Sequence, residues 1–371
     1  MAAPTEVYCD PAIAANSGTG SIGDPYGDVQ YALNTVTRDA TNGNRLNIKA
    51  GTDEVLAATL SLATYGTPSL EAPLIFRGYT SAAGDGGIGG ISGAATYKIL
   101  TSTGDGIAFE DMHLHNSGSA VLLELKRFNA IIGCQLNNTS GNGLVLSGSG
   151  FCIAENNYLH DIGGYGISVT DDVGAIVRGN YLANGSKTFT RAISLTSSAP
   201  HVCHRNIATV SGATVGIYSS TFGSYIEHNS ILSSGGTGTG IYMARSLGST
   251  VQNNLIEGFS GAGGIGIDQD SSTEEQLVLR MNAVYNCTSA YTTLGDTLSV
   301  EDNETLGATP FAKSGSDTFA NRGTYFAAAN TGNVQGGAYP TELGLDKGAV
   351  QHAAAAGGGA PRSAGMSGGI F

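Results

Sequence analysis

The chain has 371 residues, of which 56 are glycine and only 13% are charged, and it contains no tryptophan. Its formal net charge of −13 argues against nucleic-acid binding through phosphate neutralisation and against a basic membrane-surface role. No apolar run is long enough to span a bilayer.

The N-terminal part, residues 1–52, predicts a strand, a loop and a short helix. The strand is expected at VYCD, followed by the glycine-rich loop SGTGSIGDPYG. The segment DVQYALNTVT then predicts an amphipathic helix that starts at Asp28, with Val29, Leu33 and Val36 at helical spacing. We expect this helix to cover one open end of the strands that follow. No basic or apolar leader precedes the strand, so we expect no signal peptide.

Residues 53–105 predict irregular first strands at EVLAATLSL, PLIFRGYT and YKILTS. Between the last two lies SAAGDGGIGGISGAAT, residues 81–96. This stretch is so rich in glycine that we expect an exposed loop.

A repeat of about 23 to 26 residues dominates the middle of the chain. A strand-like first beat carries asparagine in one slot, and the slot recurs at Asn157, Asn180, Asn206, Asn229 and Asn254. Cys134 fills this slot one repeat earlier. A second apolar beat stays in step, marked by small residues: Gly143, Gly166, Ala192, Gly216, Gly240 and Gly266. Two markers in register predict a solenoid of stacked β-strand coils.

Stacking places the recurrent asparagines in one column. Such a column can be a metal or sugar site, or a ladder of amide hydrogen bonds at a turn, and we favour the ladder. We also expect the asparagine itself to supply the left-handed backbone of the turn.

The two beats resemble the right-handed parallel β-helix, or pectin-lyase-like, superfamily. The resemblance implies an all-β, right-handed parallel β-helix with an N-terminal capping helix, and it alone supplies the handedness. Residues 5–52 resemble the opening of bacterial and phage β-helix proteins. GATPFAKSGSDTF and LDKGAVQH resemble the closing coil of phage-type members.

The predicted boundaries follow from this reading. Coils are expected over 53–306, with late repeats at Asn282 and Asn303, and a closing coil over 307–352. Residues 353–371 form an Ala- and Gly-rich extended tail whose Gly-Ile-Phe end is suited to docking on a neighbour.

The five cysteines show no CxxC spacing. We interpret them as buried, reduced residues rather than as a disulfide or zinc framework.

Acidic residues within the repeats are few: Glu110 with Asp111, Asp161, Asp171 with Asp172, and Asp268 with Asp270. Enzymes of the superfamily use clustered Asp, Lys and Arg on one face. Asp171 and Asp268 lie about four coils, or about 19 Å, apart at strand spacing, so they cannot flank one sugar bond. Asp268 and Asp270 share a face and either hold a cation or are solvated. Asp171, Asp172, Asp268 and Asp270 remain the candidate catalytic residues, and we expect no cofactor or metal.

The basic residues do not line up either. Arg178 and Arg205 stand two and one residues before their column asparagines, which predicts opposite orientations. Lys187 and Arg191, in one long turn, are candidates for binding an anionic sugar or a neighbouring carboxylate.

The histidines carry two open interpretations. His201, His204 and His228 form either a zinc site with Cys203 or stacked surface histidines, and we favour the latter. His113 and His115 alternate with apolar residues and predict the exposed side of a strand.

Two functions remain open. The first is a structural phage virion protein, a head decoration or short tail spike or fibre. It is expected on the particle surface as a homotrimer that contacts other virion proteins and binds host polysaccharide. The second, secreted or cell-surface, is a polysaccharide lyase or glycoside hydrolase (a depolymerase) acting on an acidic polysaccharide. Tyrosines suited to stacking on sugars are Tyr158, Tyr165, Tyr181, Tyr218 and Tyr242.

Overall fold

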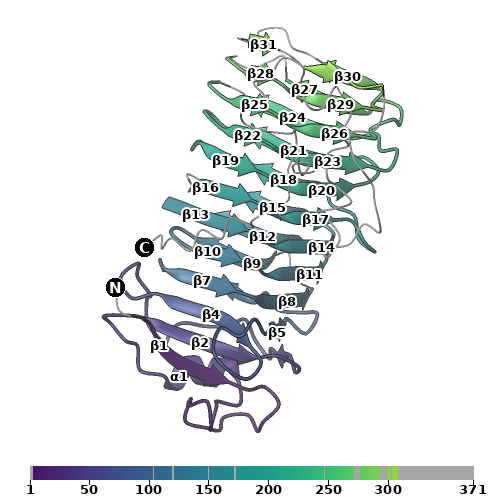
Figure 1. The fold of residues 1–371 in the computed structure, drawn as a ribbon. Helices are drawn as coiled ribbons and strands as arrows, with labels where there is room; N and C mark the ends of the chain where they lie inside the picture. Colours follow the sequence, from purple (N-terminus) through teal and green to yellow (C-terminus); the bar gives the residue numbers. More distant parts are fainter. Residues whose placement is uncertain are drawn as a thin grey trace, which may run out of the picture.

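The computed structural model describes residues 3–307, except 103, 119–120, 149, 171–172, 246, 271–275, 293–298 and 302. The predicted tail, and all of the predicted closing coil except Gly307, lie outside the described residues. In the described part, one helix accompanies three parallel sheets that wind into a single solenoid (Figure 1).

Each coil of the solenoid contributes one strand to each of three sheets. From β7 onward, eight successive described coils contain all three strands. Figure 1 shows these coils stacked in chain order from α1 and β1 at one end to β30 and β31 at the other. The repeat predicted from the two beats is confirmed.

Sheet 1 carries the first beat and has twelve strands: β1 Thr5–Cys9, β2 Asn44–Lys49, β4 Leu74–Tyr79, β7 Ile107–Glu110, β10 Ala130–Ile132, β13 Gly150–Glu155, β16 Val173–Arg178, β19 His201–His204, β22 Tyr225–Glu227, β25 Thr250–Gln252, β28 Val278–Arg280 and β31 Ser299–Glu301. Its first two strands come from the N-terminal part of the chain, which therefore starts the same sheet.

Sheet 2 follows the asparagine turn and has eleven strands: β3 Glu54–Val55, β5 Gly89–Ser92, β8 Met112–Ser117, β11 Gln135–Thr139, β14 Tyr158–Ile162, β17 Tyr181–Ala183, β20 Ile207–Val210, β23 Ser230–Ser233, β26 Leu255–Glu257, β29 Ala283–Tyr285 and β32 Glu304–Thr305. Sheet 3 carries the second beat in nine strands: β6 Leu100–Thr101, β9 Val121–Lys126, β12 Asn142–Ser147, β15 Tyr165–Val169, β18 Arg191–Leu195, β21 Val215–Ser220, β24 Thr239–Arg245, β27 Ile265–Gln269 and β30 Ser289–Thr292.

The core fills the space between the three sheets. Successive strands pair in register, so identical slots stack into inward columns such as Ile167, Ile193, Ile217, Ile241 and Ile267. These side chains are at most 1% exposed. Burying one such side chain contributes about 1.5–3 kcal/mol, and a single coil buries it only by stacking on its neighbours.

The small residues of the second beat stand where sheets 2 and 3 approach each other. A Cβ on Gly216 would lie 2.6 Å from the Gly240 carbonyl oxygen and 2.7 Å from a methyl carbon of Ile231. Gly240 meets the same contacts one coil later, with Gly266 and Ile256. The marker therefore reflects steric exclusion at a corner of the coil.

The asparagine column is a buried hydrogen-bond ladder, as favoured from the sequence. In each coil the backbone N–H and the side-chain amide of one asparagine donate to Oδ1 of the next, at 2.8–3.1 Å. The ladder runs from Asn157 to Asn303, and Cys134 joins it only through its backbone N–H. The second amide hydrogen binds a carbonyl of the preceding coil, as from Asn206 to Val177.

The predicted left-handed asparagine was misplaced by one position. Positive φ belongs to the residue before the column, for example Asn156 at 55°, Gly179 at 65° and Arg205 at 55°. That residue turns the chain between sheets 1 and 2. The column asparagine then points inward and remains available for the ladder.

Helix α1, Val29–Thr35, caps the first coils as predicted. The carboxylate of Asp28 accepts a hydrogen bond from the backbone N–H of Tyr31, the geometry of an N-cap. Val29 and Leu33 are fully buried in the same core cluster as the sheets. No helix in the described part of the chain is long and apolar enough to cross a membrane.

The expectation of an exposed loop over residues 81–96 was wrong in part, because Gly89–Ser92 forms the buried strand β5. The expectation took a high glycine content as evidence against packing. Here glycine allows close packing, since a Cβ on Gly89 would lie 2.4 Å from the carbonyl oxygen of Ile48.

The five cysteines are free thiols. Cys9, Cys134, Cys152 and Cys203 are buried, and Cys287 is partly buried. The interpretation as apolar core residues is confirmed, and burial raises the pKa of the Cys203 thiol to about 12.

Candidate functional site

The outward face of sheet 1 is a ladder of paired charges. The pairs join neighbouring coils: Arg77–Glu110 at 3.2 Å, Glu155–Arg178 at 2.7 Å and His204–Glu227 at 3.4 Å. Gln252 bridges Glu227 to Arg280, with both hydrogen bonds at 2.7 Å. These side chains bind one another across the strands, so this face serves as scaffold.

The outward face of sheet 3 carries a line of tyrosines and charged residues, which we call the tyrosine strip. Its members come from consecutive strands β15 to β27 and the residue that follows β27: Tyr165, Arg191, Tyr218, Tyr242, Asp268 and Asp270. All are partly exposed. From β15 to β27 the strip spans four strand steps, or about 19 Å at strand spacing.

Arg191 is the centre of the strip. Its guanidinium carbon lies 3.4 Å from the ring centroid of Tyr218 and 5.2 Å from that of Tyr165. Nη1 also donates to Oγ of the buried Ser194 at 3.1 Å. The sequence placed Arg191 in a long turn, but it is the first residue of β18 and faces outward from sheet 3. Stacking fixes the guanidinium plane and leaves hydrogen-bonding capacity at its edge.

Asp268 and Asp270 end the strip beside Tyr242. The Tyr242 hydroxyl donates to Oδ2 of Asp270 at 3.4 Å, and the Thr292 hydroxyl donates to Oδ1 of Asp268. Burial, reinforced by the two carboxylates, raises the pKa of Tyr242 above its usual value. Tyr242 therefore stays a protonated hydrogen-bond donor at neutral pH and is poorly suited to act as a base.

Of the predicted acidic candidates, the structure describes Asp268 and Asp270. Asp268 and Asp270 are two residues apart and lie on the outward face of sheet 3. No third His, Cys, Asp or Glu of the described residues joins them to form a possible metal site. Asp171 and Asp172 lie outside the described residues. Lys187 donates to Asn138 at 3.0 Å, on the side of sheet 2, and does not accompany Arg191.

Comparison with known proteins identifies the architecture. A family model described as the right-handed β-helix region matches residues 90–207. Among solved structures, the pectate lyase Pel9A is similar over 95% of this chain and 98% of its own, with a TM-score of 0.57 and 12% identity. The chain is a right-handed parallel β-helix. The handedness implied by the resemblance is thereby confirmed.

Two further structures share the fold. A rhamnogalacturonan lyase is similar over 91% of this chain and 97% of its own, with a TM-score of 0.54 and 11% identity. An alginate lyase of family PL6, in complex with a trisaccharide, is similar over 76% of this chain and 60% of its own, with a TM-score of 0.50 and 15% identity. No curated protein sequence matches the β-helix significantly. At these identities the likeness concerns the fold alone.

Among the described residues, sheet 2 carries three partly exposed histidines. His113 and His115 project from β8, with ring centroids 4.2 Å apart and planes within 10°. His115 Nε2 lies 2.8 Å from Oδ2 of Asp53, and His113 Nε2 lies 2.8 Å from Oδ1 of Asn137. Two strands on, His160 contacts Asp161 at 2.7 Å. The sequence predicted an exposed strand face here and missed the cluster.

The zinc alternative for His201, His204 and His228 is not supported. Cys203 points into the core, where its Sγ accepts a hydrogen bond from Asn206, while its neighbour His204 faces outward beside Glu227. His204 and His228 pack edge to face, with centroids 5.7 Å apart. His204 is partly exposed, but His228 is only 9% and His201 only 1% exposed, so the interpretation as surface histidines is confirmed for His204 alone.

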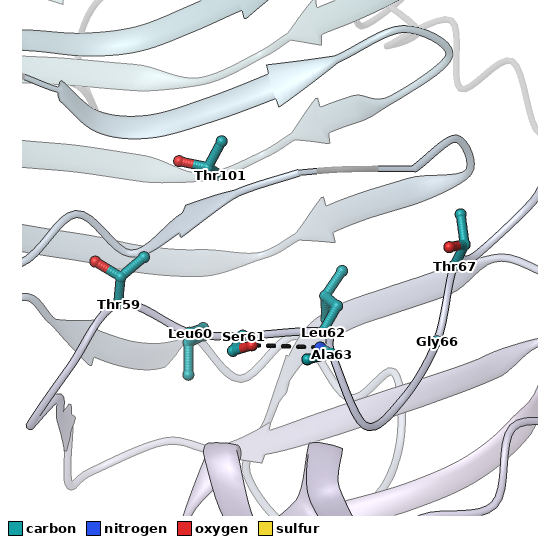
Figure 2. A pocket seen from close by; sticks show the side chains of 8 residues that line it. All are labelled: Thr59, Leu60, Ser61, Leu62, Ala63, Gly66, Thr67 and Thr101. Carbon is teal, nitrogen blue, oxygen red and sulfur yellow. Dashed lines mark hydrogen bonds between the residues drawn. The ribbon is translucent and has the colours of Figure 1, made fainter.

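A hollow of 490 Å³ opens beside β6, and Figure 2 shows its lining. The lining residues are Thr59, Leu60, Ser61, Leu62, Ala63, Gly66, Thr67 and Thr101. None of these side chains titrates near neutral pH or stacks on a sugar. This hollow therefore lacks the groups that acid–base chemistry requires.

Proposed function

We propose that this β-helix binds a polysaccharide along the tyrosine strip of sheet 3. The observation that carries the proposal is the guanidinium of Arg191, fixed between the rings of Tyr165 and Tyr218. Aromatic faces stack on the apolar faces of sugar rings, and a fixed guanidinium suits bidentate contact with a carboxylate. Arg191 therefore favours a polysaccharide that contains uronic acids.

The geometry supports binding better than cleavage. Sugar-bond hydrolysis needs an acid and a base on either side of one bond, whereas Asp268 and Asp270 both lie at one end of the strip. Burial, reinforced by the same two carboxylates, raises the pKa of Tyr242 and keeps it protonated. Lyases are among the proteins of similar fold, and that likeness keeps cleavage as a separate outcome of the test.

The test compares two variants that each remove one positive charge. Arg191→Ala removes the centre of the strip, and Arg178→Ala removes an arginine from the paired ladder of sheet 1. Binding to polygalacturonate and alginate oligosaccharides is measured by calorimetry, and thermal unfolding verifies that both variants fold.

We expect Arg191→Ala to weaken binding about tenfold or more, the loss typical of one charged hydrogen-bond donor, and Arg178→Ala to bind like the wild type. Equal losses of affinity in the two variants would show that binding depends on net charge, and would refute the tyrosine strip as the binding site. The release of unsaturated or reducing ends, assayed on the same samples, would show that the protein cleaves the polysaccharide and is an enzyme. No binding by the wild type to any acidic or neutral polysaccharide of a broad panel would overturn the proposal.

The setting on a phage particle stays a proposal. A stiff rod with a glycan-binding face suits a head decoration or a short tail spike that contacts the host surface. The homotrimer, the contacts with other virion proteins and the virion location remain predictions of the sequence, as does the secreted or cell-surface alternative.

A further inference from the structure

Among the described residues, one group of three side chains brings metal-ligating atoms together on the surface. A carboxylate oxygen of Asp53 and one ring nitrogen each of His113 and His115 lie within 4.8 Å of one another. The two histidines stand two residues apart on β8, so the period of a strand points both rings to the same face. Asp53 immediately precedes β3, which is separated from β8 by β5.

Asp53 reaches the histidines because the strand between them has no side chain at the crossing point. A Cβ on Gly90 of β5 would lie 1.6 Å from Oδ1 of Asp53. The three nearest atoms to that Cβ position all belong to Asp53. The carboxylate therefore lies across the bare backbone of Gly90 and meets His115 at 2.8 Å. Any residue other than glycine at position 90 would displace it.

A neighbouring strand orients the pair of rings. Oδ1 of Asn137 on β11 accepts a hydrogen bond from His113 Nε2 at 2.8 Å, and the His113 ring stacks on His115. The two rings are therefore held side by side, with one nitrogen of each near the carboxylate of Asp53.

We propose that Asp53, His113 and His115 bind a divalent transition metal ion of the zinc class, with a coordination position left open. Two imidazoles and one carboxylate are a donor set that zinc accepts with water in the fourth position. Calcium and magnesium prefer all-oxygen ligands, so imidazole selects against them.

The distances are compatible with such a site. Tetrahedral zinc with bonds of about 2.0–2.1 Å holds its ligand atoms about 3.3 Å apart. The contact between Asp53 and His115, at 2.8 Å, is already within that separation. The remaining separations, up to 4.8 Å, close by rotation of side chains that are partly exposed. The site lies on sheet 2 and the tyrosine strip on sheet 3, so the two are independent.

The experiment titrates metal-stripped full-length protein with zinc chloride by calorimetry and with cobalt(II) chloride by visible absorption. His115→Gln and Asp53→Asn each remove one ligand. His160→Gln is the matched control, because His160 stands in the same outward column of sheet 2 as His115, two strands away. Gly90→Ala tests the crossing without substituting a ligand, since the three atoms nearest to its added methyl group all belong to Asp53.

We expect one zinc ion per chain and a cobalt spectrum of four-coordinate type in the wild type and in His160→Gln. The two ligand variants should lose about tenfold or more in affinity, and Gly90→Ala should resemble Asp53→Asn. Thermal unfolding without metal should be alike for all the variants. Wild-type protein that binds no zinc at one equivalent, ligand variants that bind normally, or a control that loses as much would each overturn the site. Normal zinc binding by Gly90→Ala would show that Asp53 is not a ligand.

Discussion

Replacing one asparagine in the middle of the ladder tests how much the column stabilises the β-helix. The side chain of Asn206 makes five hydrogen bonds. Oδ1 accepts from the backbone and side-chain N–H of Asn180 at 3.1 and 2.9 Å. Nδ2 donates to Val177 at 2.8 Å, to Asn229 at 3.0 Å and, in a longer contact, to Sγ of Cys203 at 3.4 Å. All five are buried. Asn206→Ala removes these bonds and leaves the backbone N–H of Asn180 without this acceptor.

The expected loss is about 4 kcal/mol, because a buried hydrogen bond contributes about 0.5–1.5 kcal/mol net and an orphaned buried donor adds a further cost. That is a large share of a typical domain stability of about 5–15 kcal/mol. The assay is urea denaturation followed by circular dichroism. Ser220→Ala, on the outward side of β21, is the control and should change stability by less than about 0.5 kcal/mol. A loss for Asn206→Ala below about 1 kcal/mol would mean that the ladder does not hold the coils together.

Two further substitutions test the start of the asparagine ladder and the contact between helix α1 and β3. Cys134→Asn should stabilise the protein by about 1 kcal/mol in the same urea assay, because the amide of the new side chain can donate to Oδ1 of Asn157. That oxygen already accepts the backbone N–H of residue 134 at 2.9 Å. A lower denaturation midpoint would contradict this prediction. At the other position, burial, reinforced by the charge of Asp28, raises the pKa of Glu54 to about 7, although the N–H of Val29 opposes the shift. A folded pKa above the unfolded value means that the carboxyl group stabilises the fold at low pH and loses that contribution as pH rises from about 4.5 to 7. Glu54→Gln should therefore raise stability by about 1–2 kcal/mol at pH 8, after allowance for solvent screening, and by almost nothing at pH 4; equal effects at both pH values would refute the assignment.

The fold was accessible from the sequence because every coil repeats the same local requirement. Each column asparagine is a weak signal alone, but five in register with the small residues of the second beat identify both the period and two of the three sheet boundaries. The helix was found because Asp28 provides an N-cap and Val29 and Leu33 lie on one face. The left-handed residue before each asparagine was missed because glycine, asparagine, arginine and histidine all occupy that slot.

The tyrosine strip was within reach of the same alignment. Tyr165 and Arg191 directly precede Gly166 and Ala192 of the second beat, and Tyr218 stands two residues after Gly216. Tyr242 and Asp268 hold that same slot in the next two coils, as the strand register confirms. Reading the columns outward from the marker residues, rather than searching for pairs of acids, would have assembled the strip.

The histidine cluster was out of reach for a different reason. Asp53 and His115 are 62 residues apart, and Asp53 lies in the irregular first coils, where no period aligns it with His115. Their contact depends on Gly90, which lies in the stretch predicted to be an exposed loop. From the sequence alone we therefore expect no metal. Gly90 matters because the side chain of Asp53 crosses it, and such a role leaves no pattern in a single sequence.

The hydrogen-bond ladder also fixes the spacing between successive coils. Each coil joins the next through the same two donors and one acceptor, so residues 157–179 form a self-contained module of one rise, about 4.8 Å. Duplicating that module would lengthen the rod by one step and present Asn157 again in the correct place. Inserting a single residue within a strand would instead turn its inward side chains outward. In such a protein, the length of the rod changes by whole coils. The distance along the rod between surface groups on different coils is the number of coils between them multiplied by the rise per coil.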